Sequence, residues 1–187
     1  MERALVLIKP DGVERSLIGK VIAQFEEAGL KVTALKMLNA SDEQVQKHYT
    51  DDESWLVSVG KKTKQSYLDK GIEVKETERE IGLRVRSFLV NEITRSPIVA
   101  IVLEGNACAE VARKIAGSTE PKKADPYTIR GRYANDSYSL ADKKQRSVRN
   151  IVHVSEDSTI AEKEIKVWFS DKEICKCERA DEGALYG

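Results

Sequence analysis

Continuous apolar runs predict the strands of this chain. Residues 4–8 and 98–103 are uninterrupted apolar segments whose length suits strands that are buried on both faces. Residues 31–38 predict a strand between them, and a final strand is expected at about residues 151–152. The first run is followed at residues 9–12 by Lys-Pro-Asp-Gly, a composition that predicts a turn.

Helical spacing fills the intervals between these strands. Apolar residues at i, i+3, i+4 and i+7 from Ile18 predict a helix that closes at Gly29. A capping box that begins at Ser41 opens a short helix carrying His48 and Tyr49. Two further helical patterns follow, one before and one after the long apolar strand in the middle of the chain.

A last amphipathic helix follows the final strand. Thr159 and Glu162 have the spacing of a capping box, which predicts where this helix begins. Apolar residues at helical spacing from Ala161 onward supply its buried face. Glu164 lies in its second turn, close enough along the chain to fold back toward His153 at the end of the strand. The segment therefore presents an imidazole with a carboxylate beside it.

A histidine and a carboxylate in this arrangement suit nucleophilic chemistry. Imidazole is largely neutral and nucleophilic near neutral pH. A neighbouring carboxylate holds the ring in one tautomer and stabilises the cation that forms on reaction. The competing interpretation is structural, because a single histidine on a strand is more often a core or surface group than a catalyst.

The order of the elements predicts the fold. Residues 51–82 are rich in lysine and glutamate and are interpreted as an insertion, and residues 118–149 form a long polar stretch. Without these segments the order is βαββαβ with a closing helix, which is the split arrangement of the ferredoxin-like fold. The expected class is α/β (α+β), with a four-stranded antiparallel sheet covered by helices. One domain over residues 1–187 is expected, with residues 170–187 as a surface tail.

Composition restricts the environment and the partners. The 187 residues contain 31 Lys+Arg and 31 Asp+Glu, so no global field attracts nucleic acid or an anionic membrane. No apolar run reaches membrane-spanning length, and the N-terminus lacks the layout of a secretion signal, so a cytoplasmic protein is expected. Cys108, Cys175 and Cys177 are an odd count with too few companions for a zinc site, so all three are expected as reduced thiols.

Several residues suit an anionic substrate. Lys9 ends a strand, Arg113 lies on the helix after the third strand, and Thr119 and Arg130 lie in the long polar stretch. Arginine forks and a lysine charge suit phosphate oxygens, and a hydroxyl such as that of Tyr49 adds a hydrogen bond. The usual glycine-rich phosphate-binding motifs are missing from the sequence, so side chains would have to bind the phosphates of a nucleotide.

Blocks of sequence in a fixed order extend this interpretation. They are Leu5-Val-Leu-Ile-Lys-Pro-Asp-Gly-Val13, His48-Tyr49, Ser96-Pro-Ile-Val-Ala-Ile-Val-Leu-Glu-Gly105, Arg113 through Gly117 to Thr119, Thr128-Ile-Arg-Gly131, and Arg149-Asn-Ile-Val-His153 followed by Ser155. In this order and spacing, they resemble the nucleoside diphosphate kinase family. The block around the histidine is specific to that family, and the resemblance covers most of the chain.

The resemblance implies a nucleoside-diphosphate kinase with a ping-pong mechanism. His153 would take the γ-phosphoryl group of ATP as a phosphohistidine and pass it to a nucleoside diphosphate, while Glu164 would orient its ring. Ser155 would belong to the hydrogen-bonded surround, and Lys9 and Tyr49 would lie near the transferred group. The other nucleotide contacts implied are Arg113, Thr119 and Arg130 at the phosphates, Asn150 with Lys9 at the ribose, and Val85 at the base.

The resemblance also implies the cofactor and the partners. Mg2+ would be bound through the phosphates of the nucleotide, with no metal ligands from the protein. The expected partners are ATP and nucleoside diphosphates, with no membrane and no nucleic acid. A homo-oligomer, either a hexamer or a tetramer, is implied as well.

The chain departs from the family pattern at several positions. Val154 stands where the family has Gly or Ala and is expected to crowd a turn, and Glu156 stands in place of Asp. Tyr127 replaces a Gly, and Val85 replaces the aromatic residue that stacks on the base, so weaker base stacking is expected. Residues 133–147 are longer than in the family and are interpreted as a second insertion.

Two alternatives stay open at this point. The first is a nucleotide-binding regulatory module of the same fold with little or no turnover, which the departures and the insertions motivate. The second is contact with nucleic acid through basic patches such as residues 61–64 and 143–146. Because the net charge is zero, solvated loop charge is the simpler explanation of those patches.

Overall fold

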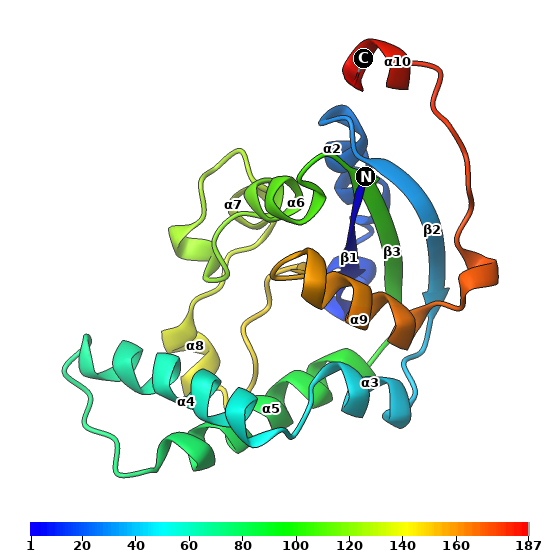
Figure 1. Cartoon of the computed structure of the whole chain (residues 1–187). Coiled ribbons are helices and arrows are strands. Elements are labelled where there is room, and N and C mark those ends of the chain that lie inside the picture. Colours follow the sequence, from blue (N-terminus) through cyan, green and yellow to red (C-terminus); the bar gives the residue numbers. More distant parts are fainter. Residues whose placement is uncertain (187) are drawn as a thin grey trace.

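A four-stranded antiparallel sheet forms the centre of the molecule (Figure 1). The structure is a computed structural model that describes residues 1–186; Gly187 lies outside the described residues. The strands are β1 (Glu2–Ile8), β2 (Lys31–Leu38), β3 (Ile98–Gly105) and β4 (Val152–Val154), in the spatial order β2-β3-β1-β4. β1 pairs antiparallel with both β3 and β4. This confirms the expected ferredoxin-like arrangement.

Helices cover both faces of the sheet. They are α1 (Pro10–Glu14), α2 (Ile18–Glu27), α3 (Asp42–His48), α4 (Glu53–Leu68), α5 (Glu78–Thr94), α6 (Cys108–Ala116), α7 (Ile129–Tyr133), α8 (Tyr138–Lys143), α9 (Ser158–Trp168) and α10 (Glu182–Tyr186), with short 3-10 helices η1 (Pro121–Lys123) and η2 (Asp171–Glu173). Among the helices of residues 1–186, none has the length and apolarity needed to cross a membrane.

Two apolar clusters, one on each face of the sheet, explain the continuous apolar runs. Val6 and Ile8 of β1 belong to the cluster that α2 and α6 complete, whereas Leu5 and Leu7 belong to the cluster of α3, α5 and α9. Successive residues of a strand point to opposite faces. A strand covered on both faces therefore needs apolar residues at every position, which is the pattern that predicted β1 and β3.

The α4–α5 hairpin is the main feature that the polar sequence of residues 51–82 did not predict. A Cβ added to Gly60 would lie 1.7 Å from the carbonyl oxygen of Glu78, and one added to Gly82 would lie 2.2 Å from that of Leu56. The two helices therefore touch backbone to backbone at both glycines. The hairpin projects below the sheet in Figure 1, opposite α6 and α7.

Three local expectations were wrong. Residues 9–12 do not form a turn alone, because Pro10 occupies the first position of the short helix α1. Helix α9 is capped by Asp157, whose side chain accepts from Ile160 N at 2.8 Å, and not by a box at Thr159. Val154 does not crowd a turn, because it lies in β4, where it pairs with Val6 of β1 and packs against the core.

Candidate active site

His153 follows a strained three-residue turn. Ile151 has φ of +70°, and Val152 N donates to Asn150 O across it at 2.7 Å. A positive φ is unfavourable for a β-branched residue and persists only where the surroundings impose it. Asp11 Oδ2 accepts from Ile151 N at 3.0 Å, and Lys9 N donates to Ile151 O at 2.7 Å. The end of β1 and the start of α1 therefore hold the turn that leads into β4.

Glu164 and Ser155 orient the His153 ring. His153 Nε2 lies 3.0 Å from Glu164 Oε1, and Ser155 Oγ donates to Glu164 Oε2 at 2.5 Å. Burial alone would raise the pKa of Glu164, but the nearby His153 outweighs it and the pKa is lowered. The carboxylate is therefore ionised and accepts a hydrogen bond from the Nε2–H group of His153. This leaves Nδ1 of His153 as the nitrogen with a free lone pair.

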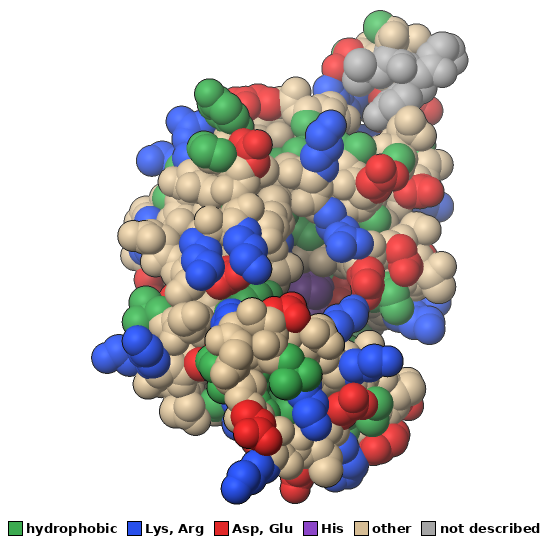
Figure 2. Space-filling model, turned by 90° about the vertical axis from the view of Figure 1, so that its left-hand side faces the viewer, with side chains coloured by type: hydrophobic (Ala, Val, Ile, Leu, Met, Phe, Trp, Pro, Cys, Tyr) green, Lys and Arg blue, Asp and Glu red, His purple; other side chains and the backbone are tan. Residues whose placement is uncertain are grey.

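The His153 ring remains reachable from solvent. Its side chain is 23% exposed, against 12% for that of Glu164. Figure 2 shows histidine atoms at the bottom of a hollow, with Lys and Arg side chains around the rim. The hollow therefore offers a nucleophile at its base and positive charge at its edge.

His48 is a second histidine at the site, to which the sequence interpretation gave no role. Its ring centroid lies 4.6 Å from that of His153, with the two planes at 83°. Trp168 Nε1 donates to His48 Nδ1 at 3.2 Å, which places the proton of the neutral ring on Nε2. Burial and the neighbouring His153 lower the pKa of His48 to about 3. A neutral imidazole therefore supports the ring of His153. The adjacent His48-Tyr49 pair in the family motif was the available signal.

The buried His48 predicts a loss of stability in acid. Its folded-state pKa of about 3 lies below the ordinary value of 6.5, so between these values the unfolded chain binds a proton that the folded chain does not. Stability therefore falls as the pH falls, by roughly 2 kcal/mol between pH 7 and pH 5 from this group. Urea denaturation at the two pH values measures the change, which should be smaller in His48→Gln. An equal loss in that variant would contradict the assignment.

Lys9 and Asn150, which the resemblance assigns together to the ribose, lie in contact. Lys9 Nζ donates to Asn150 Oδ1 at 2.7 Å and to Val148 O at 3.2 Å. Asn150 Nδ2 in turn donates to Thr119 O at 2.8 Å. Burial lowers the pKa of Lys9, although the neighbouring Asp11 opposes this effect. One polar chain thus connects the end of β1, the segment before β4 and the loop after α6.

The two arginines bind backbone carbonyls that lie on either side of His153 in the chain. Arg130 of α7 donates to Val152 O at 2.9 Å and to Gly117 O at 2.6 Å, and burial lowers its pKa to about 10. Arg113 of α6 is exposed and donates to Glu156 O at 2.7 Å. Both guanidinium groups are therefore bound to backbone carbonyls close to His153. The side chain of Thr119 is exposed in the loop between them.

Tyr49 and Val85 lie on neighbouring elements, at the end of α3 and on α5. Tyr49 is 7% exposed, and its ring lies 4.7 Å from that of His48. Burial raises the pKa of Tyr49, so its hydroxyl stays protonated as a donor. Val85 is half-buried on α5, next to Arg86, whose Nε donates to Tyr49 O at 2.7 Å. The α4–α5 hairpin is thus attached to the end of α3, the helix that carries His48.

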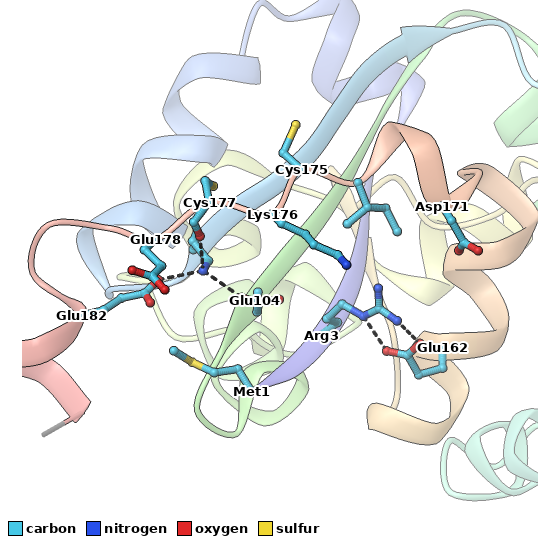
Figure 3. A pocket seen from close by; sticks show the side chains of 12 residues that line it. Met1, Arg3, Glu104, Glu162, Asp171, Cys175, Lys176, Cys177, Glu178 and Glu182 are labelled. Carbon is cyan, nitrogen blue, oxygen red and sulfur yellow. Dashed lines mark hydrogen bonds and ion pairs between the residues drawn. The ribbon is translucent and has the colours of Figure 1, made fainter.

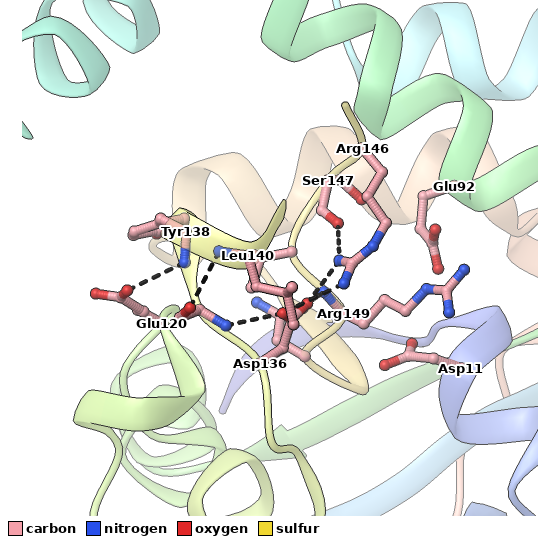
Figure 4. A network of polar contacts seen from close by, with 12 residues as sticks. Asp11, Glu92, Glu120, Asp136, Tyr138, Leu140, Arg146, Ser147 and Arg149 are labelled. Carbon is pink, nitrogen blue, oxygen red and sulfur yellow. Dashed lines mark hydrogen bonds and ion pairs between the residues drawn. The ribbon is translucent and has the colours of Figure 1, made fainter. Parts of the chain in front are cut away.

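A network around Asp136 supports the segment that leads into the site (Figure 4). Asp136 accepts from Arg146 Nη1 at 2.6 Å, from Arg149 N at 2.8 Å and from Ser137 N at 2.8 Å. The Arg149 side chain extends toward Asp11 and Glu92 in this view. The buried carboxylate therefore fixes the backbone immediately before Asn150.

The site is built for phosphate oxygens and not as a cage for a hard metal ion. His48, His153 and Glu164 offer ligand atoms that all lie within 4.8 Å of one another. However, Trp168 occupies His48 Nδ1, and Mg2+ prefers oxygen ligands to imidazole nitrogens. The lysine and the two arginines near His153 instead suit a triphosphate.

A second hollow lies near the start of β1 and the C-terminal tail (Figure 3). Two of its cations are already paired: Arg3 Nε donates to Glu162 Oε1 at 2.7 Å, and Lys31 Nζ lies 2.8 Å from Glu104 Oε1 and 2.7 Å from Glu182 Oε1. Cys175 and Cys177 line it as free thiols, as predicted. Arg3 and Lys31 are therefore already neutralised by carboxylates.

Comparison with known proteins gives a consistent result. The model of the family described as nucleoside diphosphate kinase matches residues 2–56 and 83–174. A nucleoside diphosphate kinase of Pyrobaculum aerophilum is 42% identical over 179 residues, which cover 93% of this chain and 98% of the relative. One from Borreliella burgdorferi is 36% identical over 186 residues, covering 100% and 98%.

Solved structures agree with the sequence comparison. An NDP kinase from Pyrobaculum aerophilum superposes with a TM-score of 0.89 at 40% identity, covering 94% of this chain and 99% of that one. A nucleoside-diphosphate kinase from Borrelia burgdorferi, described as a transition state mimic with bound vanadate and ADP, gives a TM-score of 0.78 at 35% identity, covering 98% and 95%.

Proposed function

Because the chain belongs to the nucleoside diphosphate kinase family and is such an enzyme, we propose that His153 carries the phosphoryl group between nucleotides as a phosphohistidine. The contact of 3.0 Å between His153 Nε2 and Glu164 Oε1 carries this assignment, because it leaves Nδ1 free to react. The 23% exposure of the His153 side chain supports access of a nucleotide to the ring.

The reaction consists of two matched displacements. In the first, the Nδ1 lone pair attacks the γ-phosphorus of ATP, the bond to the bridging oxygen breaks, and ADP leaves. In the second, a terminal oxygen of a nucleoside diphosphate attacks the phosphorus, and the P–N bond breaks. Glu164 keeps the Nε2 proton in place and stabilises the positive charge on the ring in both steps.

Cationic side chains would stabilise the equatorial oxygens of the transferred group. Phosphoryl transfer depends mainly on in-line positioning and charge stabilisation. Arg113 and Arg130 would exchange part of their bonds with backbone carbonyls for bonds to phosphate oxygens. Thr119 and the Tyr49 hydroxyl would add donors. Lys9 and Asn150, which already contact each other, would bind the ribose hydroxyls, and Lys9 would also lie near the transferred phosphoryl group.

We assign nucleotide recognition mainly to parts that all nucleotides share. Val85 is the residue proposed at the base, and a valine side chain offers less stacking area than an aromatic ring. Contacts to ribose and phosphate would therefore dominate the binding energy. One site that serves donor and acceptor in turn benefits from such low base specificity.

Mg2+ is the proposed cofactor and would arrive with the nucleotide phosphates. When bound, it neutralises charge on the phosphate oxygens. We expect chelation with EDTA to abolish transfer, and added Mg2+ in excess of the chelator to restore it. The coupled production of a second triphosphate measures both results. Unchanged activity in EDTA would contradict a role for a divalent ion.

Initial-rate kinetics test the proposed relay. Reciprocal plots against ATP at several fixed concentrations of a different nucleoside diphosphate should give parallel lines, because one product leaves before the second substrate binds. Intersecting lines would indicate direct transfer between two bound nucleotides. The regulatory-module alternative is not favoured, because the family match and the relatives, one of them described as a transition state mimic, support a transferase.

The assembly, domain limits and location are also proposals. Edge strand β2 exposes Leu35 (49%) and Met37 (57%), which supports a homo-oligomer, either a hexamer or a tetramer. Light scattering would measure its mass, and a monomer would contradict it.

The family match omits residues 57–82, which supports an insertion within a single domain. Limited proteolysis that yielded two stable fragments would contradict the single domain. The cytoplasm stays the proposed location, and cell fractionation tests it.

A further inference from the structure

The two segments interpreted as insertions meet at a specific polar contact. Tyr67, at the end of α4, donates its hydroxyl to Asp142 Oδ1 of α8 at 2.9 Å. Lys70 Nζ lies 5.9 Å from the centroid of the Tyr67 ring and 5.8 Å from that of Tyr138. A cation between two aromatic faces is attracted to both. We call Tyr67, Lys70, Tyr138 and Asp142 the clasp.

The hydroxyl at the centre of the clasp is fixed in direction. Arg84 of α5 interacts electrostatically with Tyr67 and binds both carboxylate oxygens of Glu76, at 3.0 and 2.9 Å. The Tyr67 hydroxyl donates to Asp142, while Arg84 on the same hairpin stays paired with Glu76. Tyr67 is only 8% exposed, so little water competes for these bonds.

The clasp acts on a rigid hairpin. The backbone contacts at Gly60 and Gly82 leave α4 and α5 little freedom to slide past each other. The far end of α5 is anchored in the core by Ile93, with Leu89 packed against the same cluster. A hairpin held in the core at one end and clasped at the other has a defined position relative to the sheet.

The clasp also spans the two walls of the nucleotide site. Arg84 immediately precedes Val85, the residue proposed at the base. Asp142 lies shortly before Val148 and Asn150, both of which bind Lys9. In Figure 1, α8 lies between the α4–α5 hairpin and the region of α7. The clasp therefore joins the wall that carries Val85 to the wall that carries Asn150.

We propose that the clasp sets the separation of these walls, so that Tyr67 and Asp142 act as positioning residues for nucleotide binding. The inference rests on the proposed function, since it assumes that the base lies beside Val85. Preorganising a site reduces the ordering cost of binding. Preorganisation of this kind would raise the affinity of a cleft that has a valine in place of an aromatic residue. The clasp residues themselves would not touch the reacting phosphorus.

Three conservative variants test the clasp. Tyr67→Phe and Asp142→Asn each weaken the hydrogen bond and should raise the Kd for ADP, measured by titration calorimetry, by about fivefold. The kcat at saturating nucleotide should stay within about twofold. The double variant should bind like the weaker single variant, because both changes remove one contact. Lys70→Gln removes the cation but keeps the hydrogen bond, so it should give a smaller rise.

A matched control separates this contact from general destabilisation. Tyr133→Phe also removes one hydroxyl, but that hydroxyl contacts Gln24 at 3.4 Å, so the Kd for ADP should not change. An unchanged Kd in both clasp variants, or additive effects in the double variant, would overturn the proposal. So would a fall in melting temperature with unchanged Kd, since that is the signature of a purely structural contact.

Labelling of His153 distinguishes failure of the clasp from failure of the proposed relay. If γ-labelled ATP labels the wild type and the clasp variants alike while Kd is unchanged, only the clasp is wrong. If the wild type takes up no label, the phosphohistidine relay is wrong, whatever the Kd values are.

Discussion

Replacing His153 with alanine is expected to lower kcat by at least about four orders of magnitude, since removal of a covalent nucleophile leaves only binding and charge stabilisation. The nucleotide contacts proposed for Lys9, Arg113, Arg130 and Asn150 do not involve the imidazole. The Kd for ADP should therefore change little. A coupled assay for triphosphate formation measures the first result and calorimetry the second.

His153→Ala also has a structural consequence that needs a control. The change leaves Glu164 buried beside Ser155 without its imidazole partner, so some loss of stability is expected. Thermal unfolding monitored by circular dichroism shows whether the variant is folded at the assay temperature. Activity within tenfold of the wild type in a folded variant would exclude His153 as the nucleophile.

Glu164→Gln is expected to lower kcat by about two to four orders of magnitude with little change in nucleotide affinity. The amide keeps the shape of the carboxylate but removes its charge, so the imidazolium formed on reaction loses its stabilising partner. The amide can also donate to Nε2. In that arrangement the imidazole proton moves to Nδ1, the nitrogen that must attack phosphorus.

A second carboxylate on the same helix provides the control for this variant. Glu162 lies half a turn earlier on α9 and pairs with Arg3 at the surface, with 42% of its side chain exposed. Glu162→Gln should therefore retain the wild-type rate. Single-turnover phosphorylation, followed by rapid quench, compares the two variants directly. Equal rates in Glu164→Gln and the wild type would show that the carboxylate does not orient the nucleophile.

The central strands were predictable from the sequence because burial on both faces requires an apolar residue at almost every position. β1 and β3 are covered on both faces, and an uninterrupted apolar run is the pattern for such strands. The αβ order then restricts the topology to a few arrangements. The pair of His153 and Glu164 was also accessible, since a strand end and the second turn of the next helix are close neighbours along the chain.

The α4–α5 hairpin left a weaker signal, for a physical reason. Its helices meet through backbone contacts at Gly60 and Gly82 and not through a wide apolar stripe. Periodicity analysis detects apolar stripes and is insensitive to such contacts. Helices α1, α7 and α8 are too short to show a helical period at all.

The tertiary details of the site were beyond the reach of local patterns. The role of His48 depends on its contact with a ring that is distant in the sequence and on a hydrogen bond from Trp168. The positive φ of Ile151 is imposed by Asp11 and Lys9 from another strand end. Nothing in the residues around Ile151 indicates a left-handed conformation. The clasp likewise joins two segments far apart in the chain.

Brief incubation with γ-labelled ATP and Mg2+, without an acceptor, tests the relay most directly. The wild type should gain about one acid-labile label per chain on Nδ1 of His153, and a different nucleoside diphosphate should then remove it as labelled triphosphate. His153→Ala should gain none. Nucleotide binding without labelling of the wild type, or a label that no diphosphate can remove, would contradict phosphoryl transfer through His153.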